Sequence, residues 1–122
     1  MKNEVNEIVK PIKLTDTDTK EEYVLEFDKE SVYFAEGRGF NIDRVSETPM
    51  TGIHDLFFYA FRKHHRSVSR QKADKILDDD LGGIGNLPEG FIERLYMLYS
   101  APFEKGLVDG ESGKNSKMQI EM

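Results

Sequence analysis

The sequence predicts an α+β domain that is mainly α-helical, in which an N-terminal β-hairpin precedes a bundle of about four helices. Two short segments near the N-terminus alternate apolar and polar residues on either side of a polar turn, which is typical of paired strands. Farther along, apolar residues recur every three or four positions within 50–68 and 88–100, which is typical of amphipathic helices. A chain of 122 residues is long enough for one modest core, so we expect a single domain.

The hairpin is predicted within 12–27. Its apolar residues are separated by single residues, so that they point to one face of a strand. The polar turn at 15–20 is longer than a two-residue hairpin loop, and the pairing register therefore stays open. The residues assigned to the apolar face are Ile12, Leu14, Tyr23, Leu25 and Phe27.

The first helix is predicted at 29–36. Asp28 precedes it as a candidate N-cap, because a carboxylate accepts hydrogen bonds from the free amides of a first turn. Gly37 and Gly39 follow it, and glycine readily adopts the left-handed conformation that ends many helices. Residues 40–49 are then expected to form an ordered connector. Its three anchoring side chains are Phe40, Ile42 and Val45.

The segment 50–68 is the most hydrophobic in the chain and is predicted as the central helix. Thr51 is its candidate N-cap, since Pro49 discourages an earlier start. Phe58 and Tyr59 lie about 130° from the centre of the apolar stripe, so we expect at least one of them to stay partly exposed in a monomer unless another element covers it. The stripe itself consists of Ile53, Leu56, Phe57, Ala60, Phe61, His64 and Val68.

Two further helices are predicted. Ser69 is a candidate N-cap for 70–77, and the glycine-rich run 81–86 follows that helix. Pro88 suits the first turn of the last helix, whereas Pro102 lacks an amide donor and should bend or end it near Ser100. The expected core residues of the two helices are Ala73, Ile76, Leu77, Phe91, Leu95, Leu98 and Tyr99. The apolar surface of the last helix is widened by Ile92, Tyr96 and Met97.

The ends of the chain differ in composition from its centre. Residues 1–10 are polar and are predicted as a loose lead-in to a single domain at 11–107. Residues 108–122 are predicted as a flexible linker and tail, because glycine, serine and charged residues dominate 108–117. The final alternation fits two alternatives, an edge strand against the hairpin or a tail that becomes ordered on a partner. It consists of Met118, Ile120 and Met122.

The sequence carries no recognisable signature of an enzyme or a metal protein. Without cysteine, disulfides, thiolate metal sites and cysteine nucleophiles are excluded. His64 and His65 are adjacent, so their side chains diverge by about 100° on a helix and do not chelate one ion. We therefore expect no catalytic residue, no metal and no cofactor. The lack of a signal peptide and of a long apolar run indicates a soluble cytoplasmic protein without a membrane partner.

Positive charge is concentrated in one segment. The chain has a net charge of −6, but 62–75 contains six basic residues and one acidic residue, a net charge of +5. The segment has the outline of a helix-turn-helix, so a DNA-binding protein is one alternative. The overall negative charge and the aspartates at 78–80 disfavour a nucleic-acid partner, and we interpret the basic residues as a solvated helix end. This basic patch consists of Arg62, Lys63, Arg66, Arg70 and Lys72.

Two stretches resemble a known protein family. They read P-M-T-G-I-H-D-L-F-F-Y-A-F-R-K-H-H at 49–65 and V-S-R-Q-K-A-D-K-I-L at 68–77. They are similar to tail assembly chaperones encoded in the tail-gene clusters of phages and prophages of Gram-positive bacteria, whose tails are long and non-contractile. The positions that match the outline of this family are Leu56, Tyr59, Ala60, Phe61, His65 and Ser69.

The resemblance implies a non-enzymatic protein of the bacterial host cytoplasm that is not expected in the mature virion. Such a chaperone binds the tape-measure protein, keeps this long helical polypeptide soluble and recruits tail-tube subunits around it. The resemblance also implies a longer form made by frameshifting, for which a slippery codon run within 106–117 is required. A head–tail connector subunit that forms a closed ring is a further alternative.

Binding of this kind requires exposed apolar helix surface. The predicted central and last helices both carry more apolar residues than one stripe needs, and methionine offers an adaptable contact. Completion of the intramolecular core is the competing interpretation of the same residues. The predicted partner-binding or self-association residues are Phe58, Tyr59, Tyr96 and Met97.

Overall fold

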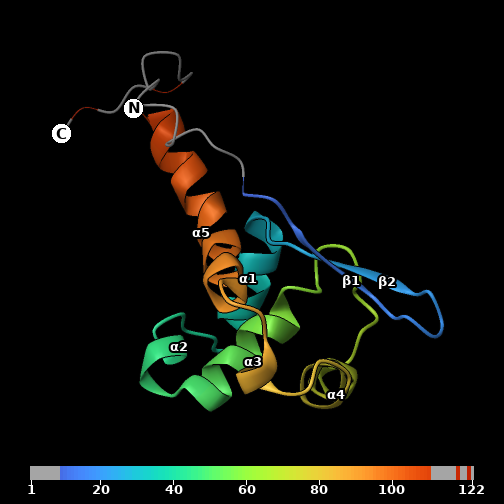
Figure 1. The fold of residues 1–122 in the computed structure, drawn as a ribbon. Coiled ribbons are helices and arrows are strands. Elements are labelled where there is room, and N and C mark those ends of the chain that lie inside the picture. Colours follow the sequence, from blue (N-terminus) through green and yellow to red (C-terminus); the bar gives the residue numbers. More distant parts are fainter. Residues whose placement is uncertain (1–8, 111–117, 119–120, 122) are drawn as a thin grey trace.

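The computed structural model describes residues 9–110, 118 and 121. It is an α+β structure that is mainly helical, with an antiparallel hairpin near the N-terminus, which confirms the predicted fold class (Figure 1). The strands are β1 (Ile12–Thr15) and β2 (Glu22–Leu25). The helices are α1 (Lys29–Gly37), α2 (Arg44–Glu47), α3 (Pro49–Tyr59), α4 (Arg70–Lys75) and α5 (Phe91–Gly110), with a π-helix at Ile76–Asp80 and a 3₁₀-helix at Ile84–Asn86.

The hairpin has the antiparallel pairing that the alternation predicts, and its register is now defined. Ile12 pairs with Leu25, and Thr15 pairs with Glu22. In the turn, the Asp16 carboxylate accepts hydrogen bonds from the amides of Asp18 and Thr19 at 2.8 and 3.0 Å, a local arrangement that aspartate favours in turns. The polar residues of the turn thus close the hairpin without an asparagine–glycine dipeptide.

The start of α1 confirms the predicted cap. The Asp28 carboxylate accepts a hydrogen bond from the Ser31 amide at 2.9 Å, while the Ser31 hydroxyl accepts one from the Asp28 amide at 2.8 Å. This reciprocal capping box satisfies two amides at the helix start. The helix ends at Gly37, and Gly39 has a φ of +94°, a conformation that glycine adopts at no steric cost.

The central helix begins earlier than predicted. Pro49 is its first residue, and Thr48 rather than Thr51 occupies the N-cap position, where its side chain makes no capping hydrogen bond. Proline is well suited to this first position, because its fixed φ is helical and its missing amide has no partner there in any helix. Pro49 therefore starts α3 instead of preventing it.

The central helix also ends earlier than predicted, at Tyr59 instead of near residue 68. The Ala60 carbonyl accepts a hydrogen bond from the Glu26 amide at 3.0 Å, so the hairpin uses an acceptor that a continuing helix would use itself. The His64 amide bonds instead to the Phe61 carbonyl at 3.2 Å, in a tighter turn. A contact with the strand, which lies far away in the sequence, thus replaces the last turns of the expected helix.

The core is formed mainly by the predicted stripes. Leu56, Phe57, Ala60 and Phe61 are fully buried or nearly so, and α1, α2, α4 and α5 all contact α3. The stripe fails at its end, because His64 is exposed and Val68 is only half-buried. Other elements contribute buried side chains to the same cluster, namely Leu25, Phe27, Val32, Phe40, Ala73, Ile76, Leu77, Phe91, Leu95, Leu98 and Tyr99.

Helix α4 begins as predicted, because the Ser69 hydroxyl accepts a hydrogen bond from the Lys72 amide at 3.1 Å. The helical segment extends beyond the predicted end at residue 77, since the π-helix continues to Asp80. A π-helix widens the backbone by one residue per turn and is rare outside short bulges. Here it places Asp78 within hydrogen-bond distance of His54 in α3.

Helix α5 passes through Pro102 and continues to Gly110, so of the two predicted alternatives, a bend or an end near Ser100, the end is wrong. Proline removes one hydrogen bond, the one to the carbonyl four residues earlier, and the remaining bonds of a 20-residue helix persist on both sides. Residues 108–110, which were predicted as the start of the linker, belong to this helix.

Several predictions for the chain ends lie outside the described residues, including the lead-in at 1–8 and the linker at 111–117. The described residues form one sheet of two strands, and neither Met118 nor Glu121 belongs to a strand. The rest of the predicted edge strand, Ile120 and Met122, is not described. In the part of the chain that is described, no helix combines the length and the apolar character needed to cross a membrane.

Gly52 sets the distance between α2 and α3. A Cβ atom at this buried position would overlap the Arg44 carbonyl and lie 2.7 Å from the Val45 amide nitrogen, both of which are backbone groups of α2. Backbone cannot rotate away as a side chain can, so the two helices must separate to admit any larger residue.

We expect Gly52→Ala to destabilise the fold by about 1–3 kcal/mol, because overpacking forces a backbone shift. Gly37→Ala is the matched control, since a Cβ there meets no atom within 4 Å and α1 gains helix propensity. Urea denaturation of both variants measures the difference. Equal stability of the two variants would contradict the close approach of α2 to α3.

Candidate functional site

Two exposed aromatic side chains form a strip along α5. Tyr96 is 46% exposed and Phe103 is 50% exposed. Seven residues separate them, so they lie on the same face of the helix, about 10 Å apart along its axis. Large apolar side chains that remain half in water on one helix face are candidates for contact with another polypeptide.

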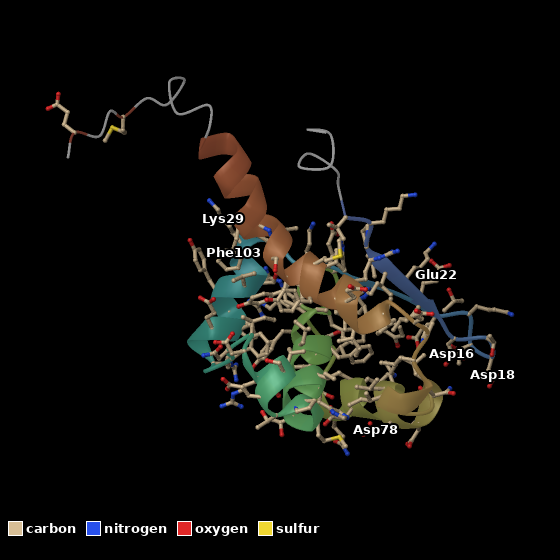
Figure 2. All side chains as sticks on the ribbon, turned by 60° about the vertical axis from the view of Figure 1, so that its left-hand side comes forward. Asp16, Asp18, Glu22, Lys29, Asp78 and Phe103 are labelled. Carbon is tan, nitrogen blue, oxygen red and sulfur yellow. The ribbon has the colours of Figure 1, made fainter. Side chains whose placement is uncertain are left out.

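An open groove lies beside this strip, between α5 and the segment that follows α1. Its volume is about 510 Å³. Figure 1 shows α1 and α5 side by side, and Figure 2 labels Phe103 on the side of the molecule where α1 begins at Lys29. The residues that line the groove are Glu36, Phe40, Asn41, Ile42, Tyr99, Ser100 and Phe103.

Three aromatic side chains, Phe40, Tyr99 and Phe103, line the groove. Phe40 is held in place because its amide donates to the Ala35 carbonyl at 3.0 Å, just after the turn at Gly39. Its ring packs edge-to-face against Tyr99 with centroids 5.4 Å apart, and the Tyr99 ring lies 5.9 Å from that of Phe103. The series runs from buried Phe40 to half-exposed Phe103, so the apolar surface of the core continues to the exterior.

Among the described side chains, one hydrogen bond joins α1 to α5 at the groove. The Tyr99 hydroxyl donates a hydrogen bond to Glu36 Oε2 at 3.0 Å. Burial of the phenol raises its pKa, and the Glu36 acceptor and its charge raise it further. Tyr99 therefore remains a neutral hydrogen-bond donor across the physiological range, and Glu36 keeps one oxygen directed by this bond.

The four predicted partner-binding residues do not form one surface. Tyr59 is buried, because Phe34 and Phe40 pack against its ring with centroids 6.1 and 5.6 Å away, so its assignment to a binding surface is wrong. Phe58 is half-buried, and the Arg70 guanidinium lies 5.9 Å from its ring centre. Neither of the two predicted binding residues of α3, Phe58 and Tyr59, is therefore freely accessible.

The two predicted residues of α5 are exposed, but they face different ways. Met97 is 47% exposed, and its position on the helix is about 100° from that of Tyr96. Tyr96 shares its face with Phe103, which was not among the predicted partner-binding residues. The spacing of seven residues between these two aromatics was the available signal for the strip. Phe40 and Ile42 were predicted as anchors of the connector, but the sequence did not indicate that they line a groove, because they reach it through tertiary packing.

Most members of the basic patch have acidic partners. Arg62 binds Glu30 at 2.8 Å, and Lys63 binds Glu26 at 3.2 Å. The other ion pairs of the patch are Arg66 with Glu30 at 3.7 Å and Arg70 with Asp55 and Asp74 at 2.9 and 3.0 Å. Lys72 is exposed and interacts electrostatically with Asp16. These carboxylates neutralise much of the positive charge that a phosphate backbone would need.

The three histidines occupy separate environments. His64 binds Glu26 at 2.8 Å on the surface, whereas the His65 ring accepts a hydrogen bond from the Val24 amide at 2.8 Å. Burial and the charge of His64 lower the pKa of His65. Within the described residues, no group of three or more histidine, aspartate or glutamate side chains is arranged to hold a metal ion.

His54 is buried, and both of its ring nitrogens face acceptors. Nδ1 lies 2.7 Å from the Met50 carbonyl oxygen, and Nε2 lies 2.7 Å from Asp78 Oδ1. Burial disfavours the charged ring, but the Met50 carbonyl and the Asp78 carboxylate together outweigh it, so the pKa of His54 is raised. The protonated ring donates to both acceptors and joins α3 to the π-helix, and Figure 2 shows Asp78 far from Phe103.

The sequence matches the model of one protein family over residues 3–122, and this family is described as a domain of unknown function (DUF5055). The comparisons with curated proteins and with solved structures gave no match. The groove beside α5 is therefore interpreted from its own geometry.

We expect Asp78→Asn to lower the pKa of His54, because the amide provides no negative charge for the protonated ring. Because the pKa of His54 is raised in the folded state, its protonated ring stabilises the fold. This stabilisation is fully present below the pKa of histidine in the unfolded chain, about 6.5, and is lost as the pH rises through the pKa of His54 in the folded protein. The variant should therefore lose more stability at pH 5.5 than at pH 8.5. NMR titration of the imidazole and denaturation at both pH values measure the two effects.

Asp79→Asn is the matched control for this experiment, since it removes the same charge from the neighbouring exposed position. It should leave the His54 pKa nearly unchanged. Identical titration curves for the two variants would show that the contact between His54 and Asp78 does not hold the proton.

Proposed function

The chain belongs to the family described as a domain of unknown function (DUF5055), and we propose that it is a non-enzymatic tail assembly chaperone of a phage or prophage, which binds the tape-measure protein and recruits tail-tube subunits. The observation that carries the proposal is the continuous apolar surface formed by the groove and the exposed strip of α5. The resemblance of 49–65 and 68–77 to such chaperones supplies the identity of the partner.

The shape of this surface suits an amphipathic helix. Tyr96 and Phe103 offer contacts two helical turns apart, and the groove beside Phe103 accepts a large apolar side chain. A helix that lies along α5 would place residues i, i+4 and i+7 against these features, as in other complexes in which a helix occupies a groove. The tape-measure protein, as a long helical polypeptide, presents many such segments.

The interior of the domain is complete without a partner. Among the described residues, every buried side-chain nitrogen and oxygen atom has a hydrogen-bond partner. No described residue covers the exposed strip of α5, and accessible apolar surface of this kind is what a chaperone for apolar helices requires.

A second partner has room on the other side of α5. A helix that covers Tyr96 and Phe103 leaves Met97 accessible, because that side chain projects about 100° away. We assign this flank to the tail-tube subunits, so that one helix of the chaperone contacts both partners. The assembly would form in the host cytoplasm before the tail is complete.

The two alternatives are a DNA-binding protein and a head–tail connector subunit, and neither has an observation that supports it as strongly as the apolar surface of α5 supports a chaperone. The DNA-binding alternative relies on the basic patch, in which four of the five members have carboxylate partners. The connector alternative requires a closed ring of subunits. A chaperone needs only the accessible apolar surface that α5 provides.

We expect coexpression with a helical fragment of the tape-measure protein from the same gene cluster to yield a soluble complex. Phe103→Asp should weaken the complex about tenfold or more, because an apolar contact is replaced by a charge that must be desolvated. Calorimetric titration of the purified proteins gives the affinities, and thermal unfolding verifies that the variant is folded.

Met50→Asp is the matched control, since Met50 is 69% exposed and does not line the groove. An aspartate in the first turn of α3 is also favourable for the helix dipole. Retention of full affinity by Phe103→Asp and Tyr96→Asp would refute the proposed site.

A further inference from the structure

We propose that the helix that occupies the groove carries a lysine or arginine next to its apolar stripe, and that this cation pairs with Glu36. This inference rests on the proposed function, because it specifies the chemistry of the partner at the same site. Glu36 is the only charged residue among the described residues that line the groove. An apolar helix that filled the groove without a cation would lie against this carboxylate and remove water from it at a cost in free energy.

The carboxylate of Glu36 has one neutral partner and no cationic partner among the described residues. The Tyr99 hydroxyl donates to Oε2, which orients the group, and the other oxygen, Oε1, makes no hydrogen bond or ion pair within the described residues. Two neighbouring carboxylates do have cationic partners, since Glu26 pairs with Lys63 and Glu30 pairs with Arg62. Glu36 differs from these two because its charge is not balanced by a cation of the described residues.

The hydrogen bond from Tyr99 also makes Glu36 a specific acceptor. An exposed glutamate usually loses side-chain entropy when it forms an ion pair, and this loss offsets most of the gain. Because Tyr99 is buried and already holds one oxygen, part of that ordering has occurred in the free protein. Exclusion of water by a bound helix would strengthen the pair further.

A second copy of this chain fits the groove less well than a foreign helix. In a symmetric dimer, each α5 would lie on the other and bring its own Tyr96 and Phe103 to the strip. Arg94 is the cation of α5 that is described, and its position is about 160° from that of Tyr96 on the helix. It also donates to the Lys10 carbonyl at 3.5 Å, so the Arg94 of a second copy would have to give up this contact to pair with Glu36.

The test uses designed helical peptides of about 18 residues with leucine at positions i, i+4, i+7 and i+11 and an otherwise neutral polar face. In successive peptides a single lysine replaces glutamine at each position that flanks the leucine stripe. Binding to the full chain is followed by fluorescence anisotropy. We expect the lysine at one flanking position to tighten binding about two- to fivefold over the all-glutamine peptide, the range for a partly exposed ion pair.

Two variants make this test specific for the site. Glu36→Gln should abolish the preference for that lysine while it retains the hydrogen bond from Tyr99. Glu47→Gln removes the same charge from an exposed position in α2 that does not line the groove, and it should preserve the preference. Phe103→Asp should weaken binding of the all-glutamine peptide, because it removes an apolar contact from the groove.

The inference is overturned if no peptide binds, if no lysine position is preferred, or if the preference survives in Glu36→Gln. It is also overturned if sedimentation shows a dimer that Phe103→Asp dissociates and that the peptides do not displace, because a second copy then occupies the groove. The test is independent of the tape-measure protein. Selective peptide binding without a tape-measure complex would reject the proposed partner and keep the inference about its chemistry.

Discussion

The fold depends on the contact between β2 and the turn that follows α3. The Ala60 carbonyl accepts from the Glu26 amide, and His65 accepts from the Val24 amide. A two-stranded hairpin alone is marginally stable in water, because it has little surface to bury. These two bonds attach the strand to the central helix and bring Leu25 and Phe27 into the core. The same bonds end α3 and turn the chain toward α4, so the arrangement of the helices follows from where the hairpin docks.

The periodicity of the sequence was sufficient for the elements and for most of the core, but not for the ends of the helices. Apolar spacing identifies which residues of α3 face inward, since each stripe must be buried against some neighbour. The residue at which a helix stops depends on competition for its carbonyls, and at Ala60 the competitor is 34 positions away in the sequence. The effects of Pro49 and Pro102 were predicted wrongly for a related reason. A proline lacks an amide donor, which costs nothing at the first position of a helix, as at Pro49, and removes one hydrogen bond inside a helix, as at Pro102.

The candidate site was predicted in part. Tyr96 was recognised because an aromatic residue outside a stripe is visible in the sequence, whereas Tyr59 was misassigned because Phe34 and Phe40 cover it from elements outside α3. The basic patch was misleading for the same reason, since a count of charges along the chain does not include Glu26 and Glu30, which lie more than 30 positions away. Surface chemistry is therefore less accessible from one sequence than core packing, because it depends on which distant side chains share the surface.

The continuation of α5 beyond Pro102 has a mechanical consequence. The helix carries the backbone about 10 Å from Phe103 to Gly110, and Figure 1 shows this end projecting away from the other helices. A helical spacer of this kind is stiff compared with a chain of glycine and serine. The C-terminal end of α5 at Gly110 is therefore held at a fixed offset from the groove.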